Sequence, residues 1–315
     1  MNDYPSRRQF LTSSTVTTAS LFAAAGTSTS ARAEIRSGGR IGFVDNNLDN
    51  FHSRTYLRIL QEDLKRHGFT VNGAFALEAE LSRAWAADND LPFFGNMKDL
   101  AEQVDYFAIL APSSPELHLQ LCGMVLPFGK PVFVDKTFAP NAATATKIFA
   151  MADRHNAVVQ TSSALRYTAV QDYVNDIGRE NVKHMVTWGG GSSFEEYIVH
   201  PLELAISCLG ADVVEVMRRG TESQSQLLLN FTNGRTAVVN LYSNARTPYA
   251  ATVTSDKATK YISVDTKALF VRATRGLIDF YRSAEPQIDR RETMAIMQVI
   301  DASGDPNSLE RFVKV

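Results

Sequence analysis

The sequence predicts an α/β fold: an N-terminal Rossmann-like doubly wound parallel sheet, followed by an α+β domain with an open, mostly antiparallel sheet. Short β-rich runs alternate with helical patterns from Gly39 to about residue 165, which is typical of a parallel sheet covered on both faces. After about residue 180, strands follow one another with little helix between them. The 315 residues are 44% hydrophobic and 21% charged, a globular composition that is sufficient for two domains.

The first domain is expected to contain five strands, each followed by a helical pattern or a turn. The third strand is apolar throughout, as buried parallel strands are. Gly68 is a stop signal for the first helix. The expected strands span residues 40–44, 69–77, 104–112, 130–136 and 157–164, and the expected helices span residues 52–68, 79–90, 115–129 and 141–156.

The second domain is expected to be built from consecutive strands. Two β-rich runs meet at Asn233-Gly234, a pair that favours a β-hairpin with a type I′ turn. A helix over residues 285–305 ends the chain and packs on one of the two domains. The expected strands span residues 181–188, 212–220, 225–231, 236–243 and 259–265.

The N-terminus resembles a twin-arginine export signal. Arg7 and Arg8 precede a mildly apolar run that ends at Ala25, and the small residues of Ala31–Ala33 suit cleavage. The apolar run is too short to remain in a bilayer, so no membrane anchor is expected. The alternative is a basic tail with no targeting role. We expect a periplasmic or secreted protein that meets the twin-arginine (Tat) translocase during export and folds beforehand, so that a cytoplasmic cofactor can leave with it.

The predicted organisation is therefore a signal peptide (1–33), a Rossmann-like domain (39–165) and an α+β domain (166–315). The net charge of −2 gives no electrostatic footprint for nucleic acid or an anionic membrane. Cys122 and Cys208 lie in apolar stretches and are expected to be buried thiols rather than a disulfide. The histidines have no metal-ligand spacing with Cys, Asp or Glu, so no metal is expected.

Several motifs resemble a known family in their order along the chain. The run from Gly129 to Asn156 contains Asp135, Lys136 and Thr137 where that family has Glu-Lys-Pro. Upstream, Pro112 and His118 take the places of a Thr-Pro strand end and the histidine that follows it. Downstream lie the following matches: Arg166 and Tyr167 at the domain junction, Glu196 four residues before His200 on a helix, and a closing helix over residues 285–303.

In this order the motifs resemble the Gfo/Idh/MocA oxidoreductases, the group of glucose–fructose oxidoreductase and inositol dehydrogenase. The resemblance covers residues 40–315 and implies NAD or NADP as the cofactor and a small carbohydrate-like substrate. It places Pro112, His118 and Asp135 on the cofactor side, and Arg166 and Tyr167 at the substrate, although a structural role at the domain junction fits these two equally.

The family's glycine-rich first turn would fall on Asp45, Asn47 and Asn50 in this chain, and all three glycines are replaced. Those glycines let the backbone approach a pyrophosphate, so these side chains would occupy its space. Asp45 would also place a carboxylate beside the phosphates, which the N-terminus of the helix only partly offsets. An alternative role is that Asp49 or Asn50 caps the following helix.

An acidic residue after the second strand would hold the adenosine ribose in this family. Glu78 and Glu80 are both available there, and either one is equally suited to the start of a helix.

Lys136 and His200 are the candidate catalytic residues. Lys136 follows a buried strand at its carboxyl end, where active sites of such sheets lie, and partial desolvation would lower the pKa of its amine. His200 is the candidate general base, and Glu196 is expected to fix its tautomer. Alkoxide formation needs such a base and a nearby cation.

Two functions remain open at this stage. The first is an exported NAD(P)-dependent oxidoreductase that acts on a carbohydrate or cyclitol hydroxyl. The second is a relative that has lost the nucleotide and works as a non-redox lyase, epimerase or hydrolase, or as a sugar-binding protein. The antiparallel sheet also provides a face for homo-oligomers.

Overall fold

The computed structural model describes residues 38–220 and 223–315. These residues form one compact unit. The predicted export signal at residues 1–33 lies outside the described residues. Within the described ranges, no helix combines the length and the apolar character that crossing a membrane requires.

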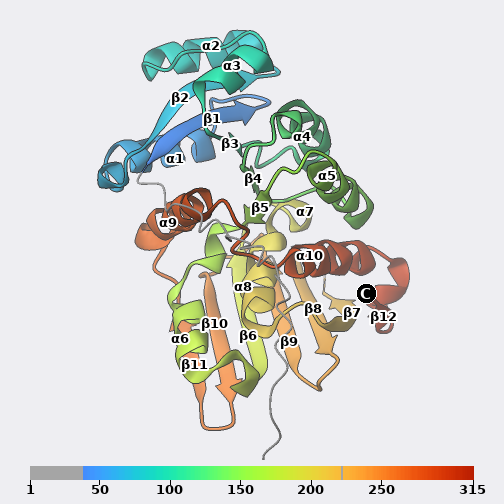
Figure 1. The fold of residues 1–315 in the computed structure, drawn as a ribbon. Helices are drawn as coiled ribbons and strands as arrows, with labels where there is room; N and C mark the ends of the chain where they lie inside the picture. The colour runs from blue at the N-terminus through green and yellow to red at the C-terminus, as the bar shows by residue number, and fades with distance from the viewer. Residues whose placement is uncertain (1–37, 221–222) are drawn as a thin grey trace, which may run out of the picture. The chain divides into compact units, whose positions relative to one another are not determined.

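The first sheet is parallel throughout and has the strand order β2-β1-β3-β4-β5 (Figure 1). This order confirms the predicted Rossmann-like half. Its strands are β1 (Gly39–Asp45), β2 (Phe69–Ala76), β3 (Tyr106–Ile109), β4 (Val132–Asp135) and β5 (Val159–Ser162).

Helices cover both faces of this sheet. One apolar cluster packs α3, α4 and α5 on one face, and another packs α1 and α2 on the opposite face. Because both faces are covered, the central strand β3 is apolar throughout, as predicted. The helices are α1 (Phe51–Gln61), α2 (Ala79–Asp88), α3 (Met97–Gln103), α4 (His118–Val125) and α5 (Ala142–Arg154).

The second sheet has seven strands in the order β11-β10-β6-β9-β8-β7-β12, and its neighbours are antiparallel except for β6 and β9. The predicted mostly antiparallel sheet is thus confirmed. Its strands are β6 (Val182–Gly190), β7 (Val213–Arg219), β8 (Gln224–Phe231), β9 (Thr236–Tyr242), β10 (Ala250–Ser255), β11 (Thr259–Ser263) and β12 (Val313–Lys314).

The helices α6 (Ala169–Ile177) and α8 (Val199–Leu209) share the apolar core of this sheet, with the short α7 (Phe194–Tyr197) leading into α8. The closing helix α10 (Arg290–Ser303) lies within the predicted range and packs on α5 as well as on α8. Short 3₁₀ turns complete the chain: η1 (Lys65–His67), η2 (Pro115–Leu117), η3 (Leu126–Phe128), η4 (Ala164–Arg166), η5 (Arg179–Asn181) and η6 (Pro306–Leu309).

The hairpin predicted at Asn233-Gly234 joins β8 to β9, but its turn type differs from the prediction. Gly234 has φ +76°, whereas the non-glycine residues with positive φ in the described ranges are Asp90, Asn156 and Ala284. A type I′ turn needs positive φ at both central residues. Here the Gly234 amide donates to Phe231 O, and a left-handed glycine follows the turn, as in three-residue hairpin loops.

Helix α9 (Thr266–Ser283) was not predicted, although its apolar residues recur at helical spacing and Asp265 caps it. It leaves the second sheet and packs on α1, closing the core of the first sheet. Tyr281 is fully buried on α9, stacks on Tyr106 at 4.5 Å and donates from its hydroxyl to Phe107 O at 2.8 Å. α9 therefore ties the C-terminal part of the chain to the Rossmann-like sheet.

We expect Tyr281→Phe to lower the free energy of unfolding by about 1 kcal/mol, because it removes a buried hydrogen bond and leaves Phe107 O without this donor. Tyr281→Ala should cost about 3–5 kcal/mol through the cavity that it leaves. Tyr261 is 57% exposed, so the matched Tyr261→Phe change should stay within about 0.5 kcal/mol. Urea unfolding measures all three, and equal effects at positions 281 and 261 would contradict the docking role of Tyr281.

Candidate active site

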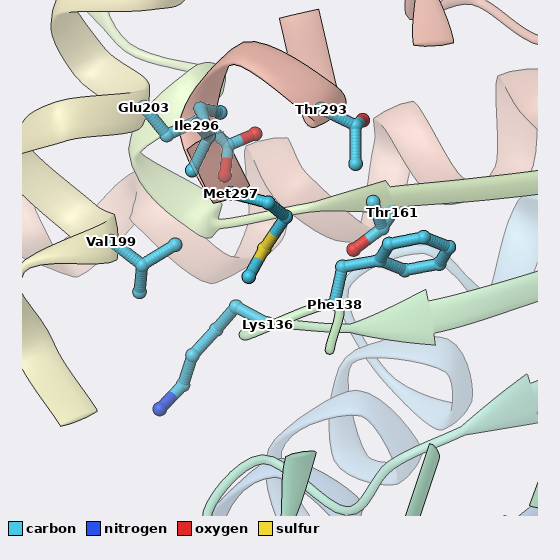
Figure 2. Close-up of a pocket in the computed structure, with 8 residues that line it drawn as sticks. All are labelled: Lys136, Phe138, Thr161, Val199, Glu203, Thr293, Ile296 and Met297. Carbon is cyan, nitrogen blue, oxygen red and sulfur yellow. The ribbon is translucent and has the colours of Figure 1, made fainter. Parts of the chain in front are cut away.

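Lys136 follows β4 at its carboxyl end and is 4% exposed. Figure 2 shows its amine pointing away from Met297, Thr161 and Phe138, which surround the base of the side chain. The amine lies 5.4 Å from the centre of the Tyr197 ring. Burial lowers the pKa of this amine, while Asp135 and Glu196 oppose the shift. A lysine whose pKa is lowered in this way can exchange a proton more readily at neutral pH.

His200 lies in the first turn of α8. Its Nδ1 is 2.6 Å from Ser163 Oγ, which also accepts a hydrogen bond from the Leu165 amide. The two lone pairs of that oxygen allow His200 to donate from Nδ1 and to keep Nε2 as a base. Burial lowers the pKa of His200 well below its usual value, and the neighbouring Lys136 and His52 lower it further. The ring is therefore neutral at neutral pH, with the lone pair of Nε2 unprotonated.

Lys136 and His200 line the same pocket, which has a volume of about 330 Å³. His52 lies on its wall, and aromatic rings make up much of the remaining surface: Phe51, Tyr197, Tyr249 and Phe270. An aromatic wall with a few polar groups suits the apolar faces and the hydroxyls of a carbohydrate-like molecule. The structure thus brings the two predicted catalytic residues together at one cavity.

Glu196 does not hold His200, contrary to the sequence prediction. It belongs to the single turn of α7, where its two carboxylate oxygens accept hydrogen bonds from Ser113 Oγ at 2.7 Å and Ser192 Oγ at 3.2 Å. Its Oε1 also lies 4.0 Å from Lys136 Nζ. The carboxylate therefore faces the lysine, and Ser163 takes the place beside the histidine.

The first turn is closed by its own side chains. Asp45 Oδ1 accepts hydrogen bonds from the Asn46 and Asn47 amides, at 2.7 and 3.2 Å. Asn50 caps α1 by accepting from the His52 and Ser53 amides, which confirms the capping alternative. The amide group of Asn50 donates to Asp45 Oδ2 and to two backbone carbonyls.

The rest of the turn is bonded in the same manner. Asn47 Oδ1 accepts from the Asp49 amide, and the Leu48 amide donates to Ser82 Oγ. Glu78 accepts from the side-chain amides of Asn46 and Asn47, at 2.9 and 3.4 Å. Glu78, a candidate ligand of the adenosine ribose, is thus bonded to the side chains of the first turn instead.

Asp135 was predicted on the cofactor side, and its carboxylate is instead fully engaged within the chain. It is 1% exposed, contacts His52 Nδ1 through Oδ2 and accepts the Lys136 amide at 2.8 Å through Oδ1. No sequence pattern selects His52, because its partner Asp135 lies 83 residues away. The peptide between Lys136 and Thr137 is cis.

Arg166, predicted at the substrate, lies in a buried ion network. Its guanidinium donates to Glu203 at 2.7 Å and to Glu292 at 2.6 Å, and Glu203 also accepts the Ser163 amide. Tyr167 lies beside it, with its hydroxyl 3.2 Å from Ser162 Oγ. Both residues are outside the pocket that holds Lys136, so the structure places them as supports of the junction.

His118 and Pro112 are also outside this pocket. His118 is fully buried, and both ring nitrogens lie at backbone carbonyls, those of Phe138 and Ala111. With no atom left for a ligand, it is a core residue rather than a cofactor contact. Pro112 lines a separate cavity of about 400 Å³ together with Glu196.

Cys122 and Cys208 are free and buried, as predicted. In the part of the chain that the structure describes, no group of three or more His, Cys, Asp or Glu side chains is arranged to hold a metal ion.

Residues 50–163 match the Gfo/Idh/MocA family model, described as an oxidoreductase family with an NAD-binding Rossmann fold. This match confirms the resemblance predicted from the sequence. No curated protein sequence is significantly similar to the chain.

Solved structures with this fold include sugar and cyclitol dehydrogenases. Scyllo-inositol dehydrogenase from Lactobacillus casei has a TM-score of 0.73 at 13% identity, covering 88% of this chain and 98% of its own. GenD2 from gentamicin A biosynthesis, solved with NAD, has a TM-score of 0.74 at 12% identity over 89% and 97%. UDP-N-acetylglucosamine 3-dehydrogenase from Acidithiobacillus ferrooxidans has a TM-score of 0.71 at 13% identity over 87% and 98%. At such low sequence identities, the structural similarity establishes the fold alone.

A dinucleotide does not fit the first turn as the chain forms it. A pyrophosphate is normally held by free amides at the start of the helix, whereas the amides of residues 46–50 and of residues 52 and 53 are bonded within the chain. Burial raises the pKa of Asp45 to about 8 despite its hydrogen bonds, so this side chain is largely uncharged at neutral pH. The pyrophosphate is therefore excluded by the bonded amides and the occupied space more than by charge repulsion.

We expect His200 to make stability depend on pH. In the folded chain its pKa is lowered, whereas the unfolded chain takes up a proton near pH 6.5. Unfolding then binds a proton below that pH, and acidification destabilises the fold. The stability difference between wild type and His200→Gln should fall by up to about 1.4 kcal/mol per pH unit below that point. Urea unfolding across that range measures it, and a difference independent of pH would contradict a buried neutral ring.

Proposed function

We propose that this chain, whose residues 50–163 match the Gfo/Idh/MocA oxidoreductases, is an exported NAD(P)-dependent oxidoreductase that acts on a carbohydrate or cyclitol hydroxyl. The observation that carries the proposal is the shared pocket of Lys136 and His200. Export is part of the proposal through Arg7 and Arg8, and the seven-stranded sheet is its proposed surface for homo-oligomers.

The pocket residues would manage the proton of the substrate hydroxyl. Nε2 of His200 accepts it, since Nδ1 is engaged with Ser163. The ammonium of Lys136, which reaches the Tyr197 ring and is balanced by Glu196, stabilises the negative charge that develops on the substrate oxygen. The aromatic rings stack on the apolar face of the substrate and exclude water from it.

Binding of NAD or NADP would require the first turn to change its hydrogen bonding. A nucleotide could lie across this edge of the sheet only after the bonds of Asp45 and Asn50 open, because these bonds occupy the amides that face the pyrophosphate. When bound, NAD or NADP would supply the hydride acceptor.

The closed turn favours a second candidate from a different class. The same pocket can run a non-redox proton transfer on a carbohydrate-like substrate, as in an epimerase or a lyase, with no nucleotide. The family match does not favour this alternative, which depends on the turn remaining closed.

We expect the native protein, produced with its own export signal and then denatured, to release one NAD or NADP per chain, detected by mass spectrometry and by the absorbance of reduced nicotinamide. Nucleotide-free protein should bind added NAD or NADP in calorimetry. Turnover of a cyclitol or an aldose by protein that neither holds nor binds a nucleotide would overturn the redox proposal in favour of the second candidate.

A variant of the first turn tests whether the hydrogen bonds of Asn50 are what keeps a nucleotide from binding there. Asn50→Gly frees the His52 and Ser53 amides and should increase nucleotide affinity at some cost in stability. Asn96→Gly, which removes the cap of α3 away from the turn, is the matched control and should leave nucleotide affinity unchanged.

We expect Lys136→Met and His200→Gln each to lower kcat by about 10²–10⁴-fold, because each removes a group that handles charge or a proton in the transition state. Substrate loss from a panel of cyclitols and aldoses, followed by NMR, measures turnover whether or not it is redox. Lys147→Met, an exposed change on α5, is the control. Full loss of turnover with unchanged affinity excludes a plain binding protein, and full activity in both site variants would contradict the proposal.

A further inference from the structure

His52 is a third titratable side chain at the pocket, and it comes from an element other than those of Lys136 and His200. It lies in the first turn of α1, whereas Lys136 follows β4 and His200 lies on α8. All three line the same cavity of about 330 Å³. It is close enough to His200 to interact with that ring electrostatically.

The ring of His52 is fixed in orientation by Asp135. The Nδ1 atom contacts Oδ2 of this carboxylate, whose other oxygen accepts the Lys136 amide. A buried carboxylate accepts but does not donate, so Nδ1 carries the proton and Nε2 keeps its lone pair. The same carboxylate would stabilise the imidazolium that forms when Nε2 takes up a proton.

Aromatic neighbours hold the ring in place. The ring centres of Phe270, Phe51 and Tyr56 lie 5.2, 5.8 and 6.3 Å from that of His52. The side chain keeps 14% of its surface exposed, and Nε2 forms no hydrogen bond with any described residue. Nε2 is therefore the ring nitrogen that remains available to a ligand in this cavity.

We propose that His52, positioned by Asp135, is a further catalytic acid–base residue of this pocket, acting on the same polyhydroxylated small molecule as Lys136 and His200. The inference rests on the proposed function for the class of substrate. In the step, an O–H bond of the substrate breaks, its proton passes to Nε2 and the electron pair stays on oxygen. The imidazolium, paired with the carboxylate, later returns the proton to a product oxygen or to water, so no oxidant is required.

With His52 as a second base beside His200, the pocket could carry out two separate proton transfers on one ligand. His52 enters it from α1 and His200 from α8, and Lys136 lines the same cavity. The titratable groups that contact His52 or line the same cavity are these: Asp135, Lys136, His200, Tyr56, Tyr197 and Tyr249.

The test uses His52→Gln and Asp135→Asn in the full chain, with the exposed His155→Gln as the matched control. We expect His52→Gln to lower kcat by about 10²-fold or more and to remove one ionisation from the pH profile of kcat/KM. Imidazole added to His52→Ala should restore part of the turnover. Asp135→Asn should shift that ionisation and lower kcat, and His155→Gln should change neither.

A measurement on the ring itself is independent of turnover. Nitrogen-15 NMR should show the His52 signal, identified by its absence in His52→Gln, as the Nδ1–H tautomer, and this should be lost in Asp135→Asn. An Nε2–H tautomer, or an unchanged pH profile in His52→Gln, overturns the inference. If His52→Gln keeps full activity while Lys136→Met and His200→Gln lose it, this inference fails and the proposed function stands. If wild type acts on no member of the panel, the proposed function fails, and the tautomer alone decides whether the Asp135-positioned base exists.

Discussion

The buried carboxylate of Asp135 is the interaction on which the site depends. It ends β4, takes the amide of the residue after it and holds His52 from α1. One carboxylate thus fixes the backbone from which Lys136 projects and the orientation of an imidazole across the sheet edge. A charged group with 1% exposure is stable in a core only when its oxygens are bonded, and both are bonded here.

The first turn differs from the glycine-rich turn of dinucleotide-binding domains in how its backbone amides are bonded. Where glycines leave amides free for phosphates, this chain uses Asp45 and Asn50 to satisfy those amides internally. The strand, the turn and the helix survive because side-chain acceptors replace the ligand as partners of the helix N-terminus. The fold of a dinucleotide-binding domain is therefore compatible with a turn that leaves no amide free for a ligand among residues 46–50, 52 and 53.

Sequence patterns predicted the parallel sheet and the later antiparallel strands, which follow from local periodicity. The carboxyl end of a parallel strand pointed to Lys136, whereas His200 was selected through the resemblance to the Gfo/Idh/MocA oxidoreductases. Helix α9 has the same kind of signal, with Asp265 as its cap and apolar residues four apart, although it was not predicted. Glu196 was misassigned because helical spacing to His200 does not hold across the junction of α7 and α8.

The identity and order of the helices and strands are encoded locally, since hydrophobic period and capping residues act over a few neighbours. The partner that each polar side chain takes is defined by the folded chain. Arg166 pairs with Glu203 and Glu292, His118 with two carbonyls, and His52 with Asp135, at sequence separations of 7 to 126 residues. The physical reason is that a buried polar group must find a partner in three dimensions, and no pattern along the chain records where that partner will lie.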